Sequence, residues 1–129
     1  MRGLSVKPLP SAAAAAALSE RILNGEGAML RSLTVGGPTS ASLTLSVQDK
    51  QRDFDWIDLT FEMSGMNDAR LVEDSQLDFI DTTEGLTVLF AEGSWGIGIG
   101  RYGSLEALKS APLYLIGASL KYEEAPFSG

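Results

Sequence analysis

Carboxylates are the side chains of this sequence with the most chemical capacity, because the chain contains no His and no Cys. The absence of His and Cys excludes Ser–His–Asp catalysis, thiolate nucleophiles and zinc sites built from these two residues. Asp78 and Asp81 could supply the acid and base of a glycoside hydrolase if they shared one cleft. A carboxylate-based hydrolase is therefore one hypothesis. The sequence fixes no separation between the two groups, so we assign no catalytic residue and no cofactor.

A second acidic group has the residue type that binds Ca²⁺ or Mg²⁺ through oxygen ligands. It consists of Asp49, Asp53, Asp55 and Asp58. The spacing lacks the Asp-x-Asp-x-Asp-Gly order and the distal Glu of the EF-hand loop. We expect these carboxylates to lie on a solvated face and predict no metal site.

Alternating glycines leave a bare stripe on one face of an expected strand over residues 95–102. The dinucleotide fingerprint does not fit, because it needs a glycine turn between a strand and a helix. Two structures do fit: a strand that curves or packs closely against the alanine-rich helix, and a floor for a small ligand or cation. The ligand hypothesis uses the candidate residues Trp95, Gly96, Gly98, Gly100, Arg101 and Tyr102.

Negative charge is concentrated in the middle of the chain. Residues 48–92 carry 12 Asp and Glu against three Lys and Arg, a local charge of −9 within a total of −7. Such a block repels nucleic acid and favours a basic protein partner. No apolar run is long enough to span a membrane, and the absence of Cys favours a cytoplasmic protein.

One expected strand combines this charge with an aromatic ring. In the strand over residues 54–63, Ile57, Leu59, Phe61 and Met63 share the core-facing side. The opposite side carries the candidate partner-binding residues Trp56, Asp58, Thr60 and Glu62. A Trp among acids is typical of a binding hot spot for a basic protein. The alternative is that a second layer of the fold covers Trp56.

Two helices and about seven strands must position these residues. Ser11 is expected to cap a helix over 11–24, and Ser104 a short helix over 105–110. A period of two, or short apolar runs between turn residues, predict the strands 29–35, 42–47, 54–63, 77–81, 86–91, 95–102 and 113–122. Residues 66–72 fit either another short strand or a loop. We expect a hairpin between the first two strands and another between 77–81 and 86–91.

The short connections predict an α+β fold with one curved, mostly antiparallel sheet. Residues 113–116 are all apolar, so we expect burial on both faces, with the N-terminal helix covering one of them. The chain is expected to form a single domain, residues 1–129. Its β-rich core would cover 28–122, with a tail or an edge segment at 1–10 and a tail at 123–129.

The pattern of strand lengths and apolar positions resembles small bacterial β-rich proteins of the immunity protein 50 and YxiG-like families. The resemblance covers residues 28–124 and rests on residues 56–61, Leu71, Phe79, residues 86–90 and the ending 114–124. It implies an immunity-like binding protein and carries over no catalytic residue.

Three functions therefore stay open, together with self-association. A non-enzymatic binding domain for a basic protein comes first, a small-ligand or cation-binding domain second, and a carboxylate hydrolase third. A homo-oligomer formed through an exposed edge strand or the Trp56 face is a further possibility.

Overall fold

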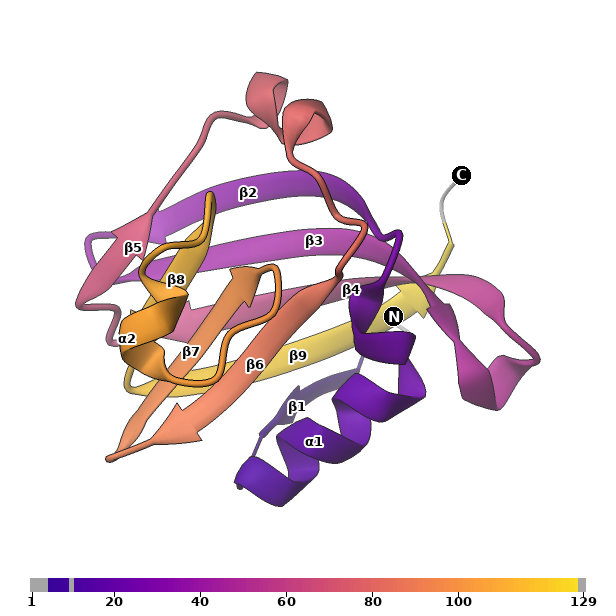
Figure 1. Cartoon of the computed structure of the whole chain (residues 1–129), viewed down its shortest axis with the longest axis horizontal. Coiled ribbons are helices and arrows are strands. Elements are labelled where there is room, and N and C mark those ends of the chain that lie inside the picture. The colour runs from indigo at the N-terminus through magenta and orange to yellow at the C-terminus, as the bar shows by residue number, and fades with distance from the viewer. Residues whose placement is uncertain (1–4, 10, 128–129) are drawn as a thin grey trace.

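The fold is described by a computed structural model that covers residues 5–9 and 11–127. Within these residues nine strands form two antiparallel sheets, so the α+β class is confirmed and the single seven-stranded sheet was wrong. Sheet A has the order β1-β9-β4-β3-β2, and sheet B has the order β5-β8-β7-β6. Figure 1 shows α1 alongside β6 and α2 over β7.

The elements have the following bounds. Sheet A contains β1 (Ser5–Pro8), β2 (Met29–Gly37), β3 (Ser40–Asp49), β4 (Asp55–Ser64) and β9 (Ser119–Pro126). Sheet B contains β5 (Asp68–Arg70), β6 (Leu86–Ala91), β7 (Ser94–Ile99) and β8 (Tyr114–Gly117). The helices are α1 (Ala12–Arg21) and α2 (Leu105–Leu108), with 3₁₀ turns η1 (Leu23–Gly25), η2 (Lys50–Arg52) and η3 (Asp74–Phe79).

The inner face of sheet A follows the alternation expected for β3 and β4. Leu43 pairs with Phe61 and Leu45 with Leu59, and all four side chains are buried in a core that both sheets share. The two helix caps are also confirmed. Ser11 Oγ accepts the Ala14 N–H at 3.2 Å, and Ser104 Oγ accepts the Ala107 N–H at 3.1 Å. Among the described residues, no helix is long and apolar enough to cross a membrane.

The expected last strand is in fact two strands in different sheets. β8 belongs to sheet B and β9 to sheet A, with Ala118 between them. Ala118 donates its N–H to the carbonyl of Ser64 at 3.0 Å, where β4 leaves sheet A. A Cβ on Gly117 would lie 2.9 Å from the backbone of Met66, so this corner needs a residue without a side chain. β9 then continues to Pro126, so a tail beginning at residue 123 was also wrong.

Three further expectations differ from the structure in whole or in part. α1 ends at Arg21, because Leu23, Asn24 and Gly25 adopt positive φ angles of 57°, 57° and 68°. Residues 5–8 form β1 at the edge of sheet A, whereas residues 1–4 and 10 lie outside the described part. The apolar run 113–116 is buried as expected, but Tyr114 and Ile116 pack against the α2 segment rather than α1.

The expected hairpin between residues 77–81 and 86–91 does not form. Residues 74–79 make the 3₁₀ turn η3, and β6 pairs with β7 through a two-residue turn at Glu92 and Gly93. Both turn residues have positive φ, 53° and 79°, as the right-handed twist of a tight hairpin requires. Leu77 and Ile80 are three residues apart, the repeat of a 3₁₀ turn, and both pack toward the core.

Candidate partner-binding surface

Trp56 lies on the outer face of sheet A, as expected from the alternation of β4. It is half-buried, and its ring centroid lies 6.0 Å from that of Phe127, just beyond the end of β9. The guanidinium carbon of Arg31, on β2, lies 5.7 Å from the centroid of the Phe127 ring. Trp56 is therefore one member of a group at one end of the sheet, and we name Trp56, Phe127 and Arg31 the aromatic patch.

The other predicted partner-binding residues continue along the same face of β4. Ser46 Oγ donates to Asp58 Oδ1 at 2.6 Å, and the hydroxyl oxygens of Thr60 and Thr44 lie 2.8 Å apart. Glu62 is exposed and sits opposite Lys121 of β9. The structure thus brings the four residues to one face. Asp58 and Thr60 are bonded within the sheet, whereas Glu62 points to solvent.

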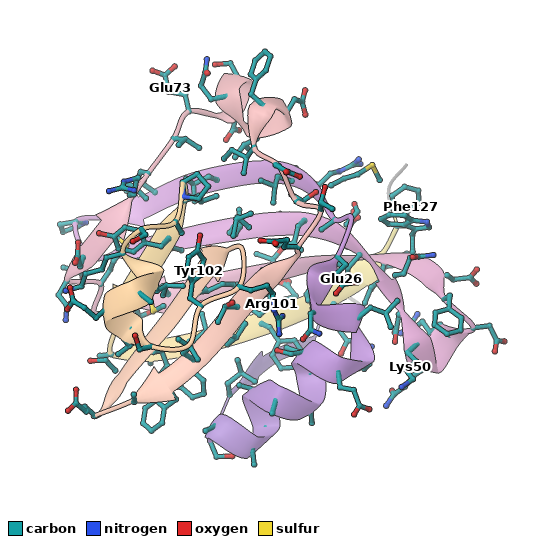
Figure 2. The ribbon with its side chains drawn as sticks, viewed as in Figure 1. Glu26, Lys50, Glu73, Arg101, Tyr102 and Phe127 are labelled. Carbon is teal, nitrogen blue, oxygen red and sulfur yellow. The ribbon has the colours of Figure 1, made fainter. Side chains whose placement is uncertain are left out.

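A second acidic region stands outside the sheets. Residues 71–84, named the acidic loop, pass over the edge of β2 and carry no Lys or Arg. Figure 2 shows Glu73 at its outer end. The exposed acids of this loop are Glu73, Asp74, Asp78, Asp81 and Glu84.

The acidic loop is fastened to the body of the protein along its length. Leu77 is only 2% exposed and belongs to the shared core. Asp74 Oδ1 accepts the Leu33 N–H of β2 at 2.8 Å. The Thr82 hydroxyl donates to the Ala28 carbonyl at 2.7 Å, and the Thr82 carbonyl accepts the Gly27 N–H at 2.9 Å. These contacts attach the loop to the protein at residues 74, 77 and 82.

Phe79 is the residue that sequence reasoning missed. It follows Leu77 by two positions, yet 82% of its surface is exposed. The only signal in the sequence was the spacing of three between Leu77 and Ile80, which turns residues 78 and 79 away from the core in a 3₁₀ turn. The expected strand over residues 77–81, with its period of two, contained Phe79 instead.

The start of β2 joins the acidic loop to the aromatic patch. Met29 and Arg31 line a cavity of about 250 Å³ together with Leu77, Asp78 and Ile80. Arg31 also contacts Phe127, so one residue touches both regions. The acidic loop, Met29 and the aromatic patch therefore form one continuous surface, which we name the binding surface.

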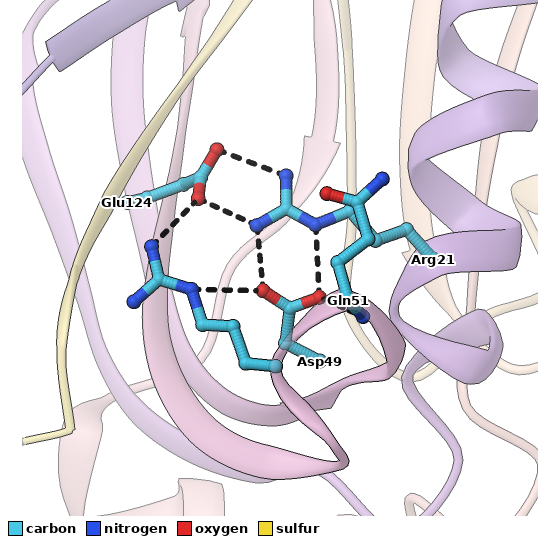
Figure 3. Close-up of polar contacts among 5 residues, drawn as sticks. Arg21, Asp49, Gln51 and Glu124 are labelled. Atoms are coloured by element: carbon cyan, nitrogen blue, oxygen red, sulfur yellow. Dashed lines mark hydrogen bonds and ion pairs between the residues drawn. The ribbon is translucent and has the colours of Figure 1, made fainter.

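Asp49 is not on a solvated face, contrary to the expectation for the group at 49–58. Its side chain is 0% exposed and accepts two hydrogen bonds from Arg21 of α1, from Nε at 2.9 Å and from Nη2 at 2.7 Å (Figure 3). Arg21 also donates to both carboxylate oxygens of Glu124, at 3.0 and 2.6 Å. Arg52 Nε lies 3.2 Å from Asp49 Oδ2. This ion network joins α1 to β3 and β9.

The network makes stability depend on pH in one direction. The two hydrogen bonds from Arg21 hold the pKa of Asp49 below its ordinary value of 3.8. The Gln51 N–H and the charge of Arg52 also lower this pKa, whereas burial of the carboxylate raises it. A carboxyl group whose pKa is lower in the folded than in the unfolded protein stabilises the fold at pH values above its unfolded-state pKa. This stabilisation is lost as the pH falls through the pKa of the folded state. Urea unfolding between about pH 5 and pH 2 should show a falling free energy of unfolding, with a shallower fall in Arg21→Met. An equally steep fall in Arg21→Met would contradict this role of Asp49.

The predicted glycine floor is filled by side chains. A Cβ on Gly96 would lie 2.6 Å from Leu105 Cδ2, and one on Gly98 would lie 2.6 Å from Leu108 Cδ1, so α2 packs directly on this strand face. The close packing expected for these glycines is present, but the partner is α2 and not the alanine-rich helix. Trp95 points to the opposite face, where it is buried beside Phe90 at 4.7 Å between ring centroids.

The other predicted ligand-binding residues lie at the end of β7. Gly100 has a φ of 116°, and the Tyr102 hydroxyl donates to the Ile99 carbonyl at 2.9 Å. Arg101 and Tyr102 border a cavity of about 310 Å³ between β6 and α1. A different cavity, of about 470 Å³, lies beside α2 and is lined by Asp68, Glu106 and Lys109 among others. The six candidates are therefore not brought to one pocket.

Asp78 and Asp81 are both exposed and do not share a cleft. Asp78 borders the 250 Å³ cavity, and Asp81 is not among the residues that line it. Asp81 Oδ1 accepts the hydroxyl and the N–H of Thr83, at 2.6 and 2.9 Å, and these bonds lower the pKa of Asp81. A general acid at neutral pH needs a raised pKa, so Asp81 is suited to carrying charge rather than donating a proton.

Comparisons with known proteins give no match to this chain among family models, curated proteins or solved structures. No family is therefore assigned.

Proposed function

We propose that this protein is a non-enzymatic binding domain for a basic protein partner. The observation that carries the proposal is the aromatic patch: Trp56 and Phe127 form a pair on an outward sheet face, and Trp56 lies in a chain segment rich in exposed carboxylates. Aromatic rings with both an exposed and a packed side are the usual anchors of protein interfaces. An immunity-like role is the finer form of the proposal and rests on the resemblance alone.

Charge supports a basic partner. Asp53 and Asp55 are exposed close to Trp56 in the sequence, and five further exposed acids lie on the acidic loop, which is part of the binding surface. A surface of one sign accelerates association with a surface of the opposite sign and rejects like-charged partners. With a formal net charge of −7, the whole chain favours the same class of partner.

A small-ligand function takes second place, and one observation favours it. The cavity of about 470 Å³ beside α2 is within the usual size range of ligand sites. Its lining contains none of the six residues predicted for the glycine stripe, so a ligand function would need a different site from the one expected.

Affinity capture from cell lysate at low salt, with elution by a salt gradient, tests the proposal. We expect a basic protein to be retained in stoichiometric amount and released as salt rises, because screening weakens the attraction. The double variant Trp56→Ala/Asp58→Asn should weaken retention at least about tenfold, as for the loss of an interface anchor. If the amount of protein retained changes neither with salt nor in the double variant, the proposal is contradicted.

The matched control is Phe90→Ala/Glu92→Gln. It likewise removes one aromatic ring and one carboxylate, but from the β6–β7 hairpin of sheet B, where Phe90 and Glu92 are both exposed. Retention should stay within about twofold of the unaltered protein.

A further inference from the structure

Phe79 is an apolar ring held in water by a rigid support. It has the largest exposed fraction among the large exposed hydrophobic residues that the structure describes. A phenylalanine left in solvent forgoes the stabilisation that burial would bring. Exposed rings are commonplace on mobile loops, but η3 is fixed by the buried Leu77 and by the bond from the Leu33 N–H to Asp74. A residue presented in this way is ready to bind without further ordering.

The charges that the acidic loop itself carries around Phe79 are all negative. Asp78 and Asp81 lie within two positions of it, and Glu73, Asp74 and Glu84 complete the acidic loop. The bonds from the hydroxyl and the N–H of Thr83 hold the pKa of Asp81 below its ordinary value. A hydrophobic anchor ringed by charge is the arrangement of an interface hot spot, in which the surrounding polar groups exclude water from the centre.

We propose that Phe79 is the principal anchor for the basic partner and inserts into an apolar pocket whose rim carries Lys or Arg. This inference rests on the proposed function and deepens it, because it names the anchor and the shape of the partner. The acidic loop carries five exposed acids and no Lys or Arg, and this charge favours a basic protein as the occupant.

The partner must also span the edge of β2. The binding surface runs from the acidic loop across Met29 and Arg31 to Phe127 and Trp56. Figure 2 labels Glu73, on the acidic loop, and Phe127, in the aromatic patch. The partner therefore takes Phe79 as its first anchor and the aromatic patch as its second.

Selection from a phage-displayed library of random peptides tests the proposal with the full chain as bait. We expect the enriched peptides to combine several Lys or Arg residues with at least one apolar residue. Phe79→Ser should weaken binding of the best peptide at least about 30-fold, and Phe79→Tyr, which keeps the ring, should weaken it far less. Val35→Ser is the matched control, because Val35 is also exposed, at 54%, but lies at the other end of β2; it should change affinity less than about twofold.

The outcomes separate this inference from the proposed function. If Phe79→Ser binds normally while Trp56→Ala/Asp58→Asn does not, the anchor is wrong and the proposed function stands. Enriched peptides without basic residues, or no enrichment at all, would overturn both. Because Phe79 is so exposed, Phe79→Ser should fold normally, which its circular dichroism spectrum checks.

Discussion

Replacing Arg21 by Met should lower the free energy of unfolding by about 3–5 kcal/mol, the usual cost of removing one partner from a buried ion pair. The change leaves Asp49 fully buried, with Arg52 and the Gln51 N–H as the remaining partners of its side chain among the described residues. It also removes both hydrogen bonds to Glu124. α1 contributes few large apolar side chains to the core, so the ion network should hold much of this helix in place.

Urea unfolding at neutral pH measures this effect, with Lys50→Met as the control. Lys50 forms an exposed ion pair with Glu20 at 3.7 Å, and such pairs contribute about 0–1 kcal/mol. A loss below about 1 kcal/mol in Arg21→Met would show that the network is not essential for holding α1.

Leu77→Ala should lower the free energy of unfolding by about 2–5 kcal/mol, because it empties a buried site in the shared core. Phe79→Ala, two residues further along the same 3₁₀ turn, should change it by less than about 0.5 kcal/mol, because the ring is in water. The pair of variants separates the residue that supports the acidic loop from the residue that the loop presents.

Urea unfolding of both variants gives the two free energies, and amide hydrogen exchange reports the loop itself. Leu77→Ala should raise exchange at residues 74–80, since the loop loses its central attachment. A large loss of stability in Phe79→Ala would mean that the ring is packed in solution, and the binding role argued for it would then fail.

The strands with clear alternation could be predicted from the sequence. β3 and β4 appear with the expected faces, because polar and apolar residues alternate from Ser42 to Val47 and from Trp56 to Met63. The helix starts at Ser11 and Ser104 were also predictable, because capping is a local interaction between residues three apart.

The division into two sheets could not be predicted in the same way. Residues 113–122 contain no Pro or charged break before Lys121, so they fit one long strand. The change of sheet at Gly117 and Ala118 depends on contacts with Met66 and Ser64, which are distant in sequence. Similarly, Arg21 meets Asp49 and Glu124 across 28 and 103 residues, so nothing local identified Asp49 as buried.

The candidate site was predictable in part. The alternation of β4 predicted one outward face, and the structure has it, with the side chains of Trp56, Asp58, Thr60 and Glu62. The contributions of Arg31 and Phe127 come from β2 and from the residue after β9, and that of Phe79 depends on a 3₁₀ turn whose period differs from that of a strand. The glycine stripe pointed correctly to close packing but could not show that α2 supplies the leucines.

The most direct test of the binding surface is a nuclear magnetic resonance titration of the isotope-labelled protein with the strongest-binding selected peptide. We expect amide shifts to change in residues 73–84, at Met29 and Arg31, and around Trp56 and Phe127, and to stay constant in β6 and β7. Changes confined to the cavity lined by Asp68, Glu106 and Lys109 would contradict this account and place binding beside α2 instead.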